Sequence, residues 1–312
     1  MQAHFDLIAI DKSWVDILLR VPALPGHDQK VVAEPLGRCP GGGGGNVACA
    51  ASRLGLRAGM VSWVGDDTDG QLVLDDLRRF GVDTSHIAVK PGAPTNFTVV
   101  LIDPSGEKAI VIAPTTFDTL HLDAPLRAYL RAAHIVYSTT YDLEQLAQVA
   151  AVVRDAGGLL AADIEPATVP PDERLRHALS LVDIAFLNAT AFDPKEAAEM
   201  AGELCAAGPR VVVLTFGAHG AFACTDRQVV RHPAFSVPVV DTTGAGDCFA
   251  AAFMAAYLRR FPLEHALVYA QAAAALSIQA HGARGGLPTH EDVLLFAHLH
   301  RDPSRFRGTS WE

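Results

Sequence analysis

The stretch Asp241–Asp247 reads DTTGAGD and runs directly into an alanine-rich apolar segment, which predicts a helix. Gly244, Ala245 and Gly246 predict a tight turn at the start of that helix, where backbone N–H groups converge and the helix dipole favours an anion. Fixed donors of this kind stabilise the oxygens of a transferring phosphoryl group. Asp247, in the first helical turn, is placed to accept the proton of an attacking hydroxyl. The alternative is an ordinary glycine-rich turn in which this aspartate caps the helix.

A second glycine-rich stretch lies near the N-terminus, where five consecutive glycines, Gly41–Gly45, precede a helix predicted from Asn46. Such a run is also typical of the dinucleotide-binding fingerprint G-x-G-x-x-G. Its third glycine, however, would fall on Asn46 or Val47 in this chain. The preceding segment, 34–40, holds two prolines and is a poor strand. The chain also has no G-x-x-x-x-G-K-[ST] motif, so ATP must be held by another architecture.

Strands and helices alternate along most of the remaining chain. This alternation implies right-handed crossovers and a mostly parallel sheet covered by helices on both faces. We therefore expect one large α/β domain over 1–312. The expected strands are 5–10, 58–64, 134–137, 159–163, 184–187 and 210–215, and the expected helices are 46–54, 69–80, 143–156, 194–206, 246–260, 263–279 and 290–299.

Two β-rich segments, about 12–38 and 94–115, interrupt this alternation. The second contains Pro104-Ser105-Gly106 between alternating apolar runs, which is a hairpin signal. We expect the two segments to pair in space into one small sheet that covers a substrate cleft as a lid. The expected lid strands are 16–21, 30–33, 96–103 and 108–113.

Composition excludes several classes of protein. Half of the 312 residues are hydrophobic and 19% are charged, which rules out disorder as a class. The 25 basic and 35 acidic residues give a net charge of −10, which argues against a nucleic-acid partner. The five scattered cysteines fit neither a disulfide framework nor a zinc site, and no apolar stretch reaches the ~18 residues of a membrane span. We expect a soluble, cytoplasmic protein.

The two glycine-rich motifs resemble a known family. Asp241–Asp247 is similar to the C-terminal signature of the ribokinase/PfkB family of carbohydrate kinases, and Gly41–Gly45 with Asn46 and ACAASRLG is similar to its N-terminal signature. Between and after them, further segments match in order: VGDDTDG (64–70), GVDT (81–84), TFGAHG (215–220) and GARGGLP (282–288). The resemblance covers nearly the whole chain. It implies a ribokinase-like fold and transfer of the γ-phosphoryl group of ATP to an alcohol group of a small sugar or sugar-like substrate.

The resemblance also implies roles for individual residues. Asp247 corresponds to the catalytic base, and the backbone of the turn before it to an anion hole. Two side chains that bind sugar hydroxyls correspond to Asp16 and Asn46. Glycines that let the sugar approach the backbone correspond to Gly42 and Gly43. ATP would lie along the positions Asn188, Thr215, Gly217 and Gly220, with Mg²⁺ bridging its phosphates.

A monovalent cation, usually K⁺, is also implied. Its site would comprise Asp241 and Thr243 with the backbone near Ala280 and Gly282. A loop serine often found there is replaced by glycine at about Gly286, which makes a K⁺ requirement doubtful.

The Asn-x-x-Glu motif that many members use near Mg²⁺ and phosphates is incomplete in this chain. It appears as Asn188–Ala191 and lacks the glutamate. Water or one of four other carboxylates would have to replace it: Asp163, Glu165, Asp193 or Glu196.

Several alternatives stay open from the sequence. A nucleoside kinase of the same fold is the second substrate class, because Trp14 or Phe97 offers a stacking partner for a base. A protein that binds a sugar or nucleotide without turnover, as a regulator, is the third. Lys30, in the first lid segment, is a candidate contact for an anionic group on the substrate. The alternation of Phe97, Val99 and Leu101 gives the lid an apolar face, and the resemblance implies a homodimer in which two lids clasp each other.

Overall fold

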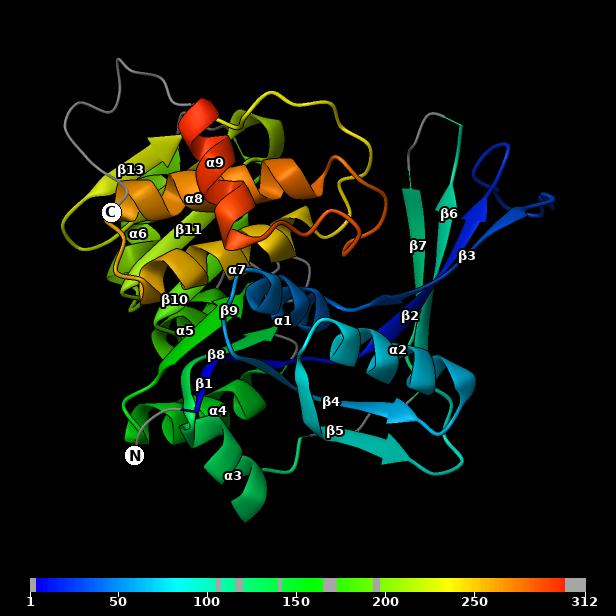
Figure 1. Ribbon diagram of the computed structural model, residues 1–312, viewed down its shortest axis with the longest axis horizontal. Coiled ribbons are helices and arrows are strands. Elements are labelled where there is room, and N and C mark those ends of the chain that lie inside the picture. The colour runs from blue at the N-terminus through cyan, green and yellow to red at the C-terminus, as the bar shows by residue number, and fades with distance from the viewer. Residues whose placement is uncertain are drawn as a thin grey trace.

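The computed structural model describes residues 4–104, 108–115, 120–139, 142–164, 173–192 and 197–300. Within these ranges the chain forms two sheets of unequal size, and the smaller one projects from the body of the molecule (Figure 1). The larger sheet contains nine strands: β1 (Phe5–Ile10), β4 (Ala58–Gly65), β5 (Asp83–Lys90), β8 (Ala133–Thr139), β9 (Leu159–Asp163), β10 (Ile184–Asn188), β11 (Val211–Thr215), β12 (Ala221–Cys224) and β13 (Val229–His232).

The larger sheet is mostly parallel, as the sequence predicts. Its strand order is β13-β12-β11-β10-β9-β8-β1-β4-β5, and the strands from β11 to β5 run parallel to their neighbours. Only β12 and β13, at one edge, pair in antiparallel fashion. From β1 the chain moves outward through β4 to β5, and it then returns to the other side of β1 with β8. The order therefore reverses between β1 and β8, and the crevice at such a switch point is where open α/β sheets bind ligands.

Helices cover both faces of this sheet because its strands are apolar on both sides. In β1, for example, Leu7 and Ala9 lie in one core cluster while Ile8 and Ile10 lie in the other. The first face carries α1 (Gly43–Arg53), α2 (Thr68–Arg79), α7 (Ala245–Leu258), α8 (Leu263–Ser277) and α9 (His290–Leu299). The second carries α3 (Ala124–Arg131), α4 (Leu143–Asp155), α5 (Glu173–Leu181) and α6 (Ala197–Ala206).

The smaller sheet combines both β-rich segments, which confirms the predicted pairing. It consists of β2 (Trp14–Arg20), β3 (Glu34–Gly41), β6 (Asn96–Ile102) and β7 (Lys108–Ala113), in the order β3-β2-β6-β7. β2 lies parallel to β6, so the two excursions of the chain meet at the centre of the sheet. β6 and β7 form the expected antiparallel pair, whereas the turn residues Ser105 and Gly106 lie outside the described residues. We call this sheet the lid.

Three local predictions are wrong. The strand expected at 30–33 is a loop, and the segment dismissed as a poor strand is β3. β3 is an edge strand, so the N–H groups that Pro35 and Pro40 lack are not needed by a further neighbour. The first helix begins at Gly43 rather than Asn46, because hydrogen bonds and close packing compensate three glycines in its first turn.

Candidate active site

Polar side chains gather where the parallel strands end, on both sides of the switch point. Asp11 follows β1, and its Oδ1 accepts a hydrogen bond of 2.9 Å from Thr139 Oγ1 at the end of β8. Its Oδ2 accepts one of 2.8 Å from the backbone of Gly44 at the start of α1. Burial raises the pKa of Asp11 despite these bonds and one from the backbone of Lys12. Asp11 therefore joins β1, β8 and the glycine-rich start of α1 at one point.

The second glycine-rich motif forms the N-terminus of α7, close to the same point. Gly244 is the N-cap and has a left-handed φ of 74°, while Ala245, Gly246 and Asp247 already belong to the helix. The N–H groups of a first helical turn have no partner within the helix, so this turn can receive an anion. The tight turn thus centres on Gly244 rather than on all three residues. A methyl group at Gly246 would project into open space, with none of the surrounding protein atoms within 4 Å.

Asp247 is held by a chain of polar side chains from three elements. Asn46 Nδ2, on α1, donates a hydrogen bond of 2.8 Å to Asp247 Oδ2. Asn46 Oδ1 accepts one of 2.9 Å from Nε of Arg284, whose NH1 group lies 2.6 Å from Asp76 Oδ2 on α2. Because its oxygen is engaged by Arg284, the amide of Asn46 must turn its N–H₂ group toward Asp247. The carboxylate of Asp247 is therefore fixed in direction.

The five glycines make room for these side chains. A methyl group at Gly43 would lie 3.3 Å from Asp247 Oδ1, and one at Gly45 would lie 2.6 Å from NH2 of Arg284. At Gly41 it would lie 2.5 Å from Asp16 Oδ2, in the lid. Gly42 has a φ of 94°, which disfavours other residues. The run brings backbone up to Asp247, and a methyl group at Gly41 or Gly45 would clash with a neighbouring side chain.

The lid contributes Asp16 on the face toward this glycine run. Asp16 is opposite Thr98 in the β2–β6 pair, and the Thr98 hydroxyl donates a hydrogen bond to its carboxylate. Trp14, two residues earlier, lies on the same face and next to Gly42. The structure thus brings together Asp16, Gly42, Gly43, Asn46 and Asp247, as expected for the acceptor side of the site. Lys30 is not with them: it lies in the exposed β2–β3 connection at the outer end of the lid (Figure 1).

The four expected ATP contacts lie further along the same edge of the sheet. Asn188 and Thr215 are paired residues at the ends of β10 and β11. Gly217 and Gly220 bound the short 3₁₀ turn that follows β11, and both have positive φ. Asp163, one candidate replacement for the missing glutamate, ends β9 between Thr139 and β10. The other three, Glu165, Asp193 and Glu196, lie outside the described residues.

Asp241, Thr243 and Gly282, which were predicted for a possible monovalent-cation site, lie together, and a lysine of the lid joins them. Lys108, the first residue of β7, places Nζ 2.8 Å from Asp241 Oδ1 and 2.7 Å from Thr243 Oγ1. Gly282 donates its backbone N–H to Asp241 Oδ2 at 3.0 Å, in the loop after α8 that also contains Ala280. Burial alone would raise the pKa of Asp241, but hydrogen bonds from Lys108, Thr243 and Gly282 outweigh it and the pKa is lowered.

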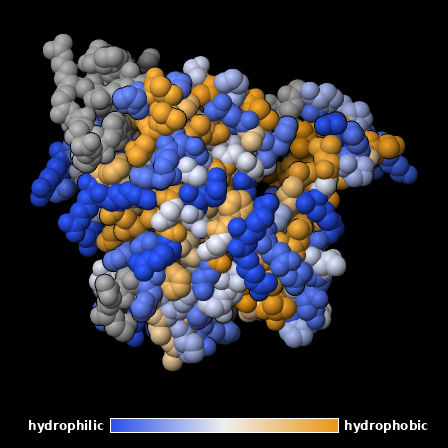
Figure 2. Space-filling model, viewed as in Figure 1, coloured by the Kyte–Doolittle hydropathy of each residue, from blue (hydrophilic) through white to orange (hydrophobic). Residues whose placement is uncertain are grey.

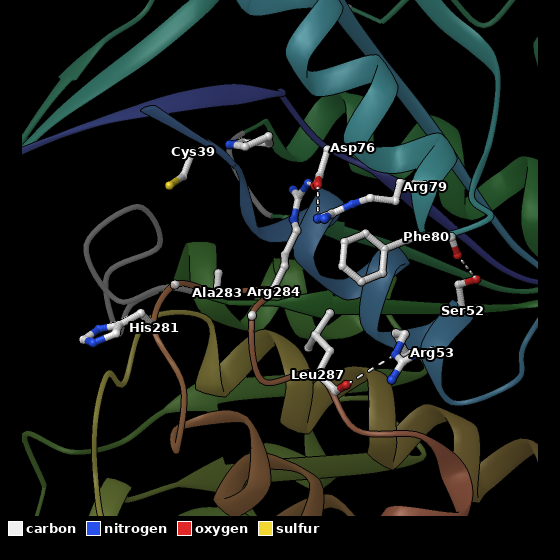
Figure 3. A pocket seen from close by; sticks show the side chains of 13 residues that line it. Cys39, Ser52, Arg53, Asp76, Arg79, Phe80, His281, Ala283, Arg284 and Leu287 are labelled. Atoms are coloured by element: carbon white, nitrogen blue, oxygen red, sulfur yellow. Dashed lines mark hydrogen bonds and ion pairs between the residues drawn. The ribbon is translucent and has the colours of Figure 1, made fainter. Parts of the chain in front are cut away.

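Behind the network lies an open polar cavity of about 650 Å³ between α1, α2, β3 and the loop 281–287. Figure 3 shows Arg284 and Arg79 pointing at Asp76 from different elements, while Arg53 reaches the carbonyl of Leu287. Arg284 is the innermost of these, with 7% of its side chain exposed. Its guanidinium separates this cavity from Asn46.

Three residues of the site were missed by the sequence reasoning. Asp11 had a signal, because an aspartate directly after a buried strand marks a strand end. Arg284 and Lys108 had none: each acts through a partner more than 130 residues away. Within the described part of the chain no group of three or more His, Cys, Asp or Glu residues is arranged to hold a metal ion. No helix of that part is long and apolar enough to cross a membrane.

Comparison with known proteins agrees with this geometry. The family of pfkB carbohydrate kinases matches residues 5–290. The ATP-dependent ribose-1-phosphate kinase of Halopiger xanaduensis is 32% identical over 285 residues, covering 90% of this chain and 94% of its own. The nucleoside kinase of Methanothermobacter thermautotrophicus is 28% identical over 95% and 97% of the two chains. The structure of Arabidopsis thaliana ribokinase with ribose and ATP has a TM-score of 0.81 at 24% identity, covering 95% of this chain and 99% of that one.

The nine-stranded sheet, the lid and the glycine-rich start of α7 define a ribokinase-like fold. The chain belongs to the pfkB family of carbohydrate kinases, which are phosphotransferases with an alcohol group as acceptor.

Proposed function

We propose that this protein transfers the γ-phosphoryl group of ATP to a hydroxyl of a small sugar or sugar-like substrate, with Asp247 as general base. The observation that carries the proposal is the position of Asp247. It lies in the first turn of α7, its carboxylate is directed by Asn46, and its Oδ1 faces the bare backbone of Gly43. The N-cap position of α7 is occupied by Gly244, so Asp247 is not the capping residue of this helix.

The chemistry follows from these placements. The acceptor hydroxyl, held between Asp16 and Asn46, gives its proton to the carboxylate of Asp247 as its oxygen attacks the γ-phosphorus. The new O–P bond forms while the bond to the β-phosphate oxygen breaks, and ADP leaves with that oxygen. Backbone N–H groups of the turn at Gly244 stabilise the charge on the equatorial oxygens.

Mg²⁺ would accompany the ATP phosphates and neutralise part of their charge. Asp163 and Asn188 end neighbouring strands and offer the oxygen ligands that Mg²⁺ prefers, directly or through water. The residues of this edge therefore fit the ion without a dedicated cage.

A nucleoside acceptor is the second candidate. Trp14 lies beside Gly42 on the cleft face of the lid, where an aromatic ring can stack on a base. A relative of similar length is named a nucleoside kinase. Sugars and nucleosides both present ribose-type hydroxyls, so Asp16 and Asn46 suit either class.

The test is a panel of acceptors with ATP and Mg²⁺, read as ADP release. It should contain free pentoses and hexoses, ribose 1-phosphate, and purine and pyrimidine nucleosides. We expect turnover with a sugar or sugar phosphate. A nucleoside as the best acceptor would replace the proposal by the second candidate, and a folded protein that turns over no acceptor would contradict both.

We also propose that two copies associate through their lids, in the cytoplasm. Strand β7 is an edge strand with three consecutive exposed apolar residues, Ile110, Val111 and Ile112. An exposed apolar edge pairs readily with another strand, and apolar side chains cover part of the projecting lid in Figure 2. Light scattering should give twice the mass of the chain, and Val111→Lys should shift it to the monomer. A monomeric wild type at micromolar concentration would contradict this assembly.

A further inference from the structure

A lysine of the lid makes a direct contact with the motif that shapes the phosphoryl-binding turn. Lys108 begins β7, and its Nζ lies 2.8 Å from Asp241 Oδ1 and 2.7 Å from Thr243 Oγ1. Both partners of the ion pair are sheltered, with 29% and 19% of their side chains exposed. Thr243 directly precedes Gly244, the N-cap of α7. The ammonium group therefore lies one residue from the turn that we assign to the transferring phosphoryl group.

The oxygens that a monovalent cation would need are already engaged. Oδ1 of Asp241 accepts hydrogen bonds from Lys108, from the backbone N–H of Thr243 at 2.9 Å and from its hydroxyl at 2.6 Å. Oδ2 accepts the N–H of Gly282 at 3.0 Å. A carboxylate oxygen offers about two acceptor positions, so Oδ1 is filled, whereas Oδ2 has one donor. A cation placed at the same oxygens would also face an ammonium group of like charge. The residues present do not fit K⁺.

We propose that the ammonium group of Lys108 takes the place of a monovalent cation, and that the lid delivers it. The inference rests on the proposed function of the turn. Lys108 compensates the charge of Asp241, and Thr243, held by both groups, fixes the direction in which the chain enters the turn. Since β7 belongs to the lid, the order of the anion site depends on the lid lying over the body. Lys108 is a positioning residue, because it acts through Asp241 and Thr243.

A second ion pair between lid and body provides the matched control. Arg38 on β3 lies 2.6 Å from Asp69 on α2, and its side chain is 51% exposed. This pair also ties the lid down, but it touches no part of the motif Asp241–Asp247. Loss of the Arg38–Asp69 ion pair should weaken the contact between lid and body without making nucleotide binding depend on a monovalent cation.

The experiment compares wild type, Lys108→Ala and Arg38→Ala in potassium chloride and in choline chloride at equal ionic strength. Binding of the non-hydrolysable ATP analogue AMP-PNP with Mg²⁺ is measured by calorimetry, and thermal melting is recorded in both salts. We expect the wild type to bind equally in the two salts. Lys108→Ala should bind about fivefold more weakly in choline, the effect of losing a partly exposed ion pair, and should recover in potassium. Arg38→Ala should show the same salt ratio as the wild type.

Two results would overturn the proposal: a wild type that binds the analogue more tightly in potassium, or a Lys108→Ala variant indifferent to the cation. If Lys108→Ala does not fold, Lys108→Gln, which keeps the length of the chain, allows the same comparison. The thermal-melting measurement distinguishes a failure of this proposal from a failure of the proposed function. Should the analogue not bind at all, the function fails, while melting of Lys108→Ala in the two salts still tests whether potassium replaces the lysine.

Discussion

The two sheets of this molecule place polar side chains in different ways. The inner strands of the larger sheet are largely buried on both faces, and the polar side chains Asp11, Asp163 and Asn188 lie where such strands end. The lid is less buried and carries polar side chains in mid-strand, where Asp16 and Thr98 are paired. In the proposed mechanism, residues at these strand ends and at the start of α7 act on the phosphoryl group, while Asp16 of the lid contacts the acceptor.

This difference predicts which changes affect chemistry and which affect recognition. Residues fixed by the larger sheet should alter the rate of phosphoryl transfer or the stability of the fold. Residues of the lid should alter binding and leave the body folded.

Asp247→Asn should produce the largest effect, because the variant keeps the shape of the side chain and loses the proton acceptor. General-base catalysis contributes about 10²–10⁴-fold, so kcat should fall by at least that order while the melting temperature changes little. Glu264→Gln is the control, since Glu264 is an exposed acid in the first turn of α8 outside the site. Turnover of Asp247→Asn within about threefold of wild type would show that this carboxylate is not the base.

Arg284→Met should weaken the fold and the site together. Removing one partner of a buried ion pair costs about 3–5 kcal/mol, and here Asp76 would keep only the exposed Arg79. Asn46 would lose the donor that orients its amide, so kcat should fall as well. Urea unfolding measures the first effect and steady-state kinetics the second. A fully active, equally stable variant would mean that the network does not direct Asp247.

Asp16→Asn should affect recognition alone. A hydrogen bond to a charged group contributes about 1.5–3 kcal/mol, so kcat/KM for the acceptor should drop about 10–100-fold. Affinity for AMP-PNP and the melting temperature should stay at wild-type values. Glu34→Gln, which changes an exposed lid pair with Arg20, should leave all three quantities unchanged. A loss of nucleotide binding in Asp16→Asn would place this residue outside the acceptor site.

The smallest expected effect concerns the stability of the fold in acid. It arises at the ion pair between Lys108 on β7 and Asp241 in the segment before α7. The pKa of Asp241 is lower in the folded protein than its ordinary value of 3.8. Its contribution to the free energy of unfolding is therefore complete above about pH 4 and disappears as the pH falls below that value. Asp241→Asn should lose about 1 kcal/mol or less at pH 7 and should show a shallower decline in acid. Urea unfolding between pH 3 and pH 7 measures both slopes, and parallel slopes would contradict the shift.

Much of the larger sheet could be predicted because its signals are local. Apolar strands and amphipathic helices predicted most of its elements within a few residues, and β1, β9 and α9 with their observed bounds, as also for the lid strand β7. The exposed edge strands β5 and β13, the short buried strand β12 and the short helices α3 and α5 were missed, since none has a long apolar period. β3 was misjudged because its prolines are acceptable only at a sheet edge, which tertiary structure decides.

The same distinction between local and long-range signals applies to the candidate site. The two glycine-rich motifs were visible in sequence, and the structure brings them together through the bond between Asn46 and Asp247. The surrounding ion pairs were not visible, since nothing near Arg284 points to Asp76 and nothing near Lys108 points to Asp241. Lys108 thus lies beside Asp241 and Thr243, for which the resemblance implied a possible monovalent-cation site.

The parallel pair of β2 and β6 also bears on how the chain reaches its folded state. Asp16 and Thr98 are bonded although they are 82 positions apart, and two helices and two strands of the body lie between them in sequence. Pairing across such a separation is slow, because a long loop must close first. During synthesis, the edge of β2 that pairs with β6 therefore remains unpaired until β6 has left the ribosome. We expect the amides of the lid to become protected from hydrogen exchange last during refolding. At high concentration, we expect partly folded chains to associate wrongly through the unpaired edge of β2.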